Sequence, residues 1–192
     1  MQTVITIGQN INTSKYNEKL LIKSIPLIRK MSLLEKTSFI SELKDILAQC
    51  GIALVFIPSL KRSKVYTVVK WVNKDKVILG ITNRGQDADK FWFSLFHEIK
   101  HILQKQKNII VDTDKTSALE KEANEYAFDI LIPHDKYIQY KSKCSNKYFS
   151  QESITSFSEN LGVHPGIVVG RLQNDGLLKH STLNNLKCKY SF

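Results

Sequence analysis

The sequence has few cysteines and no long apolar run, and each shortage excludes a class of protein. The three cysteines, Cys50, Cys144 and Cys188, are odd in number and lie far apart. They therefore predict neither a disulfide framework nor a Cys-x-x-Cys metal site. No segment approaches the roughly 20 apolar residues that span a bilayer. The start of the chain alternates apolar and polar residues, unlike a secretory signal. We therefore expect a cytoplasmic protein with no membrane partner.

The composition predicts one globular domain with a basic surface. Of the 192 residues, 42% are apolar and 24% are charged, which is enough to bury a substantial core. The formal net charge is +10, and the lysines are spread along the chain with a denser stretch over residues 61–76. Such a charge attracts acidic partners, but nucleic-acid binding also needs an element shaped to contact phosphates or bases. A solvated, lysine-rich surface is therefore the favoured interpretation.

Apolar periodicity predicts an α+β fold, in which helices precede and follow a small antiparallel sheet. Pro26 lies inside the first expected helix, and a Ser32 and Glu35 capping box starts a second helix that runs up to Gly51. The β-branched residues beyond it predict three strands, of which the last two form a hairpin. Residues 1–15 are expected to be extended or weakly ordered. Apart from the helix that starts at the capping box, the expected helices cover 16–31, 89–104, 116–132, 151–161 and a short stretch from 165. The expected strands cover 52–57, 65–72 and 77–82.

The strongest functional signal is a His-Glu-x-x-His pattern on the expected helix 89–104. His97 and His101 are four positions apart, so they share a helix face and could bind one zinc ion. Glu98 follows the first histidine and, in this motif, serves as the general base toward water. The rest of the helix is largely apolar, and metal coordination would offset the cost of burying these polar groups. The alternative is a chance pattern whose histidines are hydrogen-bonded in the core.

A third metal ligand should follow, because a catalytic zinc usually takes three protein ligands and keeps one position open. Glu120, on the next expected helix, is the best candidate, and Asn124 on its face could accept a hydrogen bond from a ligand imidazole. Ser117 and Glu120 also have the spacing of a capping box, so a purely structural role for Glu120 stays open. Glu122 is the alternative ligand, although it lies on a different helix face from Asn124.

The segment 91–103, followed by 120–133, resembles the ImmA/IrrE zinc metallopeptidases. Their pattern is His-Glu-x-x-His, then Glu-x-x-Ala-Asn-x-Phe-Ala and a Leu-x-Pro ending, with Tyr126 here in place of the Phe. The resemblance implies that Glu120 is the third zinc ligand. It also implies a zincin-like peptidase domain over 51–192, joined in one compact unit to a helical lead-in over 1–50. Members of the family control helix-turn-helix repressors, and several cleave or inactivate them.

The resemblance extends toward the C-terminal half of HigA-like antitoxin regulators, through residues 91–98 and 165–173. Those regulators carry an N-terminal helix-turn-helix, and residues 1–50 contain no recognisable one. We therefore expect a zinc endopeptidase whose partner is a protein, either a DNA-binding repressor or a toxin. We expect no sequence-specific DNA binding by this chain alone. The alternative function is a non-proteolytic regulatory module that has kept its zinc for stability.

Other residues carry weaker signals. His134 and Tyr126 could polarise a substrate carbonyl, although such residues more often serve packing or the surface. Gly162 and Pro165 suit the end of one helix and the start of the next, and this pair superficially resembles a helix-turn-helix. The second helix is apolar apart from Arg171 and Gln173, so we expect it to pack in the core.

Overall fold

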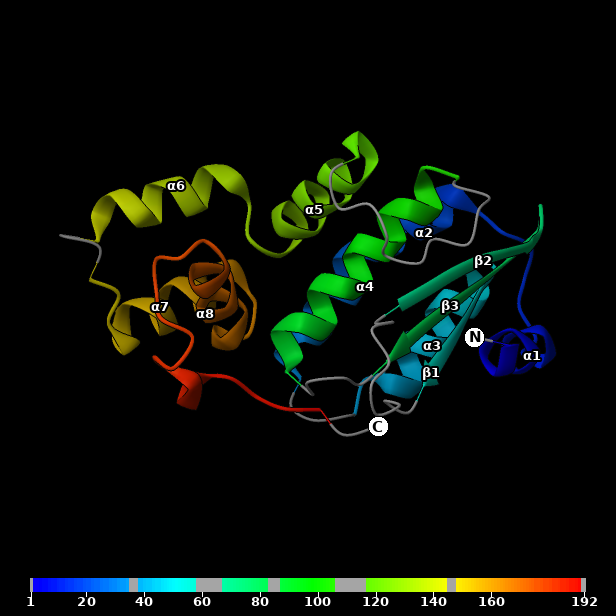
Figure 1. Ribbon diagram of the computed structural model, residues 1–192, viewed down its shortest axis with the longest axis horizontal. Coiled ribbons are helices and arrows are strands. Elements are labelled where there is room, and N and C mark those ends of the chain that lie inside the picture. Colours follow the sequence, from blue (N-terminus) through cyan, green and yellow to red (C-terminus); the bar gives the residue numbers. More distant parts are fainter. Residues whose placement is uncertain are drawn as a thin grey trace.

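The computed structural model describes residues 2–34, 38–57, 67–82, 87–105, 117–144 and 148–190. Helices precede and follow a small sheet, so the predicted α+β class is confirmed (Figure 1). Within the described ranges, every helix is too short or too polar to span a bilayer. The elements are α1 (Gln2–Asn10), α2 (Glu18–Lys30), η1 (Met31–Leu33), α3 (Ile40–Gln49), β1 (Ile52–Ile57), β2 (Thr67–Asn73), β3 (Lys76–Thr82), α4 (Ala88–Leu103), α5 (Ala118–Leu131), α6 (His134–Lys143), α7 (Gln151–Leu161), α8 (Pro165–Asn174) and η3 (Asn184–Leu186).

The sheet has the strand order β1-β3-β2 and is mixed. β2 and β3 form the predicted hairpin, in which Val69 lies opposite Leu79. β1 pairs with β3 in parallel, with Leu54 opposite Leu79, so the prediction of a wholly antiparallel sheet was wrong. The physical reason is that β2 takes the edge, and the hairpin returns β3 into the space beside β1. Strand spacing along the chain does not encode that choice of neighbour.

The N-terminal segment covers one face of the sheet. The prediction of an extended or weakly ordered start over 1–15 was wrong for residues 2–10, because α1 is a helix whose Val4 packs with Val55 and Ile78. Residues 12–15 have no regular secondary structure. A Cβ atom on Gly80 would lie 2.7 Å from Val4, and one on Gly8 would lie 2.6 Å from Ile78. Glycine at these two positions therefore permits the close approach of helix and sheet. The helix is thus stabilised by its contact with the sheet, which the short apolar and polar alternation of this segment does not specify.

The helices α2 and α3 belong to the main core. Leu21, Ile28 and Leu47 are fully buried in the same hydrophobic cluster as residues of the sheet and α4. Pro26 lies within α2 as predicted and is exposed to solvent. Ser32 does not start α3 and lies instead in the 3-10 helix η1, so the predicted capping box was wrong; Glu35 lies outside the described residues. Ser32 is instead fully buried, eight positions before α3 begins at Ile40.

The C-terminal helices gather at one end of the molecule, and the sheet with α1 lies at the other (Figure 1). Gly162 ends α7 in the left-handed conformation, with φ of 67°, and Pro165 begins α8, as predicted. α8 buries Val168 and Val169, which confirms its expected role in packing. α6 was not predicted, because its sequence is polar apart from a few residues such as the buried Tyr137.

One arginine ties the lead-in to the C-terminal helices. From α2, Arg29 donates hydrogen bonds to the carbonyls of Ile130 (2.6 Å), Leu131 (3.1 Å) and Leu161 (2.8 Å). These carbonyls belong to the last turns of α5 and α7, where helices lack internal donors and carry partial negative charge. Burial lowers the pKa of the guanidinium, which nevertheless stays charged at neutral pH.

We predict that Arg29→Met lowers the free energy of unfolding by about 2–4 kcal/mol, because it removes charged donors from buried helix ends. Urea denaturation measures the change. Lys30→Met is the matched control, since Lys30 is exposed on the same helix and should change stability by less than about 0.5 kcal/mol. Equal losses of stability in the two variants would contradict the role of Arg29 in joining α2 to the ends of α5 and α7.

Candidate metal centre

α4 presents two chemically different faces. Trp92, Leu95 and Ile99 are fully buried and anchor one face in the core. The opposite face carries His97 and His101, which lie one turn apart as predicted. The buried face fixes the helix and therefore the direction of both imidazoles.

The three predicted ligands meet at one point. The Nε2 atoms of His97 and His101 are 2.9 Å apart. The Glu120 carboxylate reaches both rings, with Oε2 at 3.3 Å from His97 Nε2 and Oε1 at 3.0 Å from His101 Nε2. Ligand atoms of a tetrahedral zinc at about 2.1 Å lie roughly 3.4 Å from one another, which is close to these separations. The cluster is therefore compatible with one bound metal ion.

Glu120 contributes its backbone to the cap of α5 and its carboxylate to the histidine cluster. Ser117 caps α5, because its Oγ accepts a hydrogen bond of 3.2 Å from the Glu120 backbone N–H. The cap uses only the backbone, so the carboxylate is available to the histidines. Glu122, the alternative ligand, instead forms an ion pair of 2.7 Å with Lys100 outside the cluster. Hydrogen bonds from Lys100, and then from Gln104, lower the pKa of the Glu122 carboxyl.

Gln104 orients one imidazole, a role that the sequence interpretation missed. Its Oε1 lies 3.1 Å from His101 Nδ1, so the ring can donate from Nδ1 and present Nε2 to a metal. The Gln104 amide group in turn donates to Glu122 Oε2 at 2.8 Å and lies 3.4 Å from the Leu119 carbonyl. We predicted that Asn124 accepts an orienting hydrogen bond from a ligand imidazole, and for His101 Gln104 takes that place. Its position one turn beyond His101 on α4 was the available signal.

Glu98 is buried beside the cluster, with an exposed fraction of 5%. The hydroxyl of Thr67, at the start of β2, donates a hydrogen bond to Glu98 Oε1. The sheet therefore orients the carboxylate that follows the first histidine. This contact joins residues 31 positions apart, which is beyond the reach of a local motif.

Tyr126 and His134 are not among the residues that form the metal cluster in the described part of the chain, which are His97, His101 and Glu120. Both line a separate cavity of about 710 Å³, together with Lys100 and Glu122, and its described lining includes none of the three cluster residues. Burial raises the pKa of Tyr126 to about 12, so the phenol stays protonated at neutral pH. The structure thus gives no support to either residue as the group that polarises a substrate carbonyl.

Comparison with known families agrees with this geometry. Residues 51–173 match the sequence model of the IrrE N-terminal-like domain, which defines a peptidase family. The matched region runs from the start of the sheet into α8 and includes both helices of the metal cluster. No curated protein matches the chain.

We predict that the protein binds about one Zn²⁺ or Co²⁺ per chain and that Gln104→Ala weakens this affinity about 10- to 100-fold, because loss of an orienting partner loosens a ligand. Competition with a chromophoric chelator measures the affinity. Gln139→Ala is the control, since this glutamine is exposed on α6. Unchanged affinity in Gln104→Ala would remove the orienting role, and the absence of metal binding by the parent protein would remove the site itself.

Proposed function

We propose, since the chain belongs to the peptidase family of the IrrE N-terminal-like domain, that it is a zinc-dependent endopeptidase. The observation that carries the proposal is the meeting of His97, His101 and Glu120, which supply three ligand atoms within 4.8 Å of one another. Two nitrogen donors and one carboxylate form a ligand set that zinc peptidases use. A buried glutamate directly beside such a set has a clear use in hydrolysis.

The mechanism follows from the positions of these side chains. Zinc, when bound, supplies Lewis acidity, which polarises a peptide carbonyl and lowers the pKa of water. Glu98 takes a proton from the water molecule while the oxygen of that water bonds to the carbonyl carbon. The carboxylic acid then returns this proton to the departing amine as the C–N bond breaks. Thr67 holds the Glu98 carboxylate in place during both transfers.

The presence of Glu98 favours the peptidase function over that of a zinc-stabilised regulatory module. A purely structural metal site has no need of a base, whereas a peptidase requires one within reach of the attacked carbonyl. Burial at 5% exposure also shields this carboxylate from bulk water. These features support hydrolysis over a binding role alone.

We predict that Glu98→Gln keeps the metal but lowers peptide cleavage by about 10²- to 10⁴-fold, because the amide cannot accept a proton. Metal content and cleavage rate are measured on the same preparation. Glu42→Gln is the control, since Glu42 is exposed on α3. Full cleavage by Glu98→Gln would transfer the role of base to another residue. If the parent binds zinc but cleaves nothing, the regulatory-module function replaces this proposal.

The proposed substrate is a cytoplasmic protein, either a DNA-binding repressor or a toxin. Support comes from the resemblance to the ImmA/IrrE peptidases and, against DNA as the target, from the burial of Val168 and Val169 on α8. A helix packed in this way is poorly placed to read DNA bases.

We predict that Glu98→Gln captures such a protein in a pull-down, while the parent protein cleaves it.

Any DNA binding by this chain should be non-specific and should fall steeply with salt, because displaced counterions drive it. A mobility-shift assay with random DNA and with the captured repressor's operator, at 50 and 200 mM salt, measures this. Tight operator binding by this chain alone at the higher salt would contradict the proposal.

A further inference from the structure

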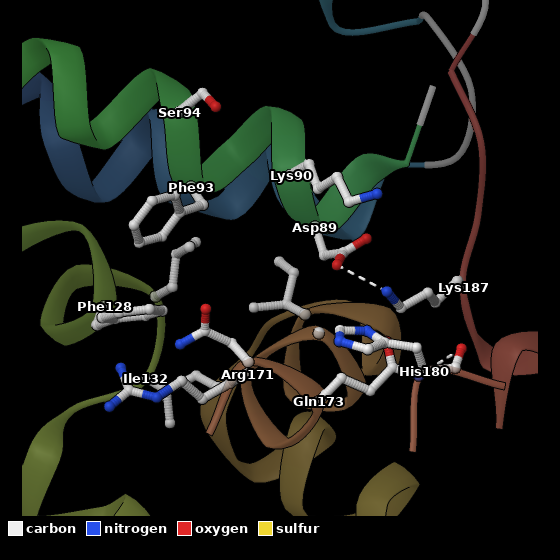
Figure 2. A pocket seen from close by; sticks show the side chains of 14 residues that line it. Asp89, Lys90, Phe93, Ser94, Phe128, Ile132, Arg171, Gln173, His180 and Lys187 are labelled. Carbon is white, nitrogen blue, oxygen red and sulfur yellow. Dashed lines mark hydrogen bonds and ion pairs between the residues drawn. The ribbon is translucent and has the colours of Figure 1, made fainter. Parts of the chain in front are cut away.

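A cavity of about 350 Å³ lies between α4, α5, α8 and the segment that follows α8 (Figure 2). Its volume falls in the range of small-ligand pockets and far exceeds the gaps of normal packing. Its walls come from parts of the chain that are distant in sequence, and Figure 2 shows the side chains of Phe93, Phe128 and Arg171 beside it.

The cavity adjoins the metal cluster along α4. Phe93 lines it, and the Phe93 ring centroid lies 5.9 Å from that of His97. Ser94, a second lining residue, precedes His97 by three positions and therefore neighbours it on the helix surface. Phe128 of α5 lies 4.6 Å from Phe93 between ring centroids and continues this aromatic wall. A peptide held at the cluster would thus have the cavity beside it.

The lining is largely apolar, and its charges are compensated. Each charged side chain on it has an ion-pair partner: Lys187 with Asp89 (2.9 Å), Lys90 with Asp87 (2.6 Å) and Arg171 with Asp175 (3.1 Å). The Arg171 guanidinium also lies over the Phe128 ring, 3.6 Å from its centroid. The apolar part of the wall includes Leu131, Ile132 and Ile167. The uncharged polar residues of the lining are Ser94, Gln173, Asn174 and His180, and the Gln173 amide already donates to the Thr182 carbonyl at 3.0 Å.

The apolar walls and the paired charges determine which kind of side chain the cavity favours. An acidic or basic side chain would lose its hydration on entry and would have to compete for a group that is already paired. An apolar or aromatic side chain would gain from burial against Phe93, Phe128 and Ile167 without disturbing an ion pair. The size of the cavity favours a large side chain over alanine.

We infer that this cavity receives the substrate side chain next to the cleaved bond and selects large apolar or aromatic residues there. The inference rests on the proposed peptidase function. It makes Ile167 a specificity-determining residue, because this fully packed α8 side chain, 3% exposed, forms part of the cavity wall.

The test uses peptide hydroxamates, which bind zinc directly and need no cleavage to report affinity. A series carrying one alanyl, leucyl, phenylalanyl, naphthylalanyl, aspartyl or lysyl side chain is titrated into the zinc-loaded protein by calorimetry. The parent protein should bind the leucyl and phenylalanyl compounds at least about 10-fold more tightly than the alanyl, aspartyl and lysyl compounds. Ile167→Ala should shift the optimum toward the naphthylalanyl compound, because the wall recedes.

Val169→Ala is the matched control, since Val169 is fully buried on the same helix and is absent from the cavity lining. It should leave the ranking of side chains unchanged. A flat ranking in the parent protein, or the same change of ranking in both variants, would overturn the inference. So would a lack of affinity for every hydroxamate.

Cleavage of a peptide library by the parent separates this inference from the function on which it rests. Cleavage with an apolar preference beside the cut bond supports both. Cleavage without such a preference overturns the specificity pocket and leaves the peptidase standing. Graded hydroxamate affinity without cleavage of any peptide would refute the peptidase, while retaining the cavity as a side-chain pocket beside the metal cluster.

Discussion

The approach of α5 to α4 is the constraint on which the metal centre depends. The Glu120 carboxylate must reach two imidazoles of another helix, with separations of 3.0 and 3.3 Å. Ala123 and Ala127 are fully buried on α5, and their small side chains let the two helices lie close together. Larger residues at these positions would move the carboxylate away from the histidines.

Both ends of α5 are held by contacts with other elements. At its N-terminal end, Ser117 caps the backbone, and Gln104 of α4 bonds to Glu122. At its C-terminal end, Arg29 binds the carbonyls of Ile130 and Leu131. Arg29 lies outside the region that matches the family, which begins at residue 51. Helix α2 therefore helps to hold α5, which carries Glu120, although α2 itself contributes no residue to the cluster.

The polar groups around the cluster form a connected arrangement. Thr67 bonds to Glu98 from the sheet, while Gln104, which follows the last residue of α4, bonds to His101. Toward the start of α4, the side chain next to His97 is that of Phe93. Phe93 and Phe128 together form the aromatic wall that leads into the cavity. In the proposed function, the residues that act on the peptide bond and those that select the side chain beside it lie along adjacent stretches of α4.

The sequence by itself determined the features that local periodicity encodes. The spacing of His97 and His101 required only that one helix form, and the apolar residues between and around them predicted that helix. The bounds of β1, α7 and the start of α8 followed in the same way, from β-branched runs, Gly162 and Pro165. Glu120 was a candidate on spacing and became the implied ligand only through family resemblance.

Tertiary structure alone decided which distant groups meet. The parallel pairing of β1 with β3, the folding of α1 onto the sheet and the contact of Thr67 with Glu98 join segments whose local sequences do not specify a neighbour. Glu120 and Glu122 differ by two positions, yet one faces the imidazoles and the other pairs with Lys100. Their roles depend on how α5 is rotated and placed against α4, and that placement is set by packing and by Arg29, which local propensity does not encode.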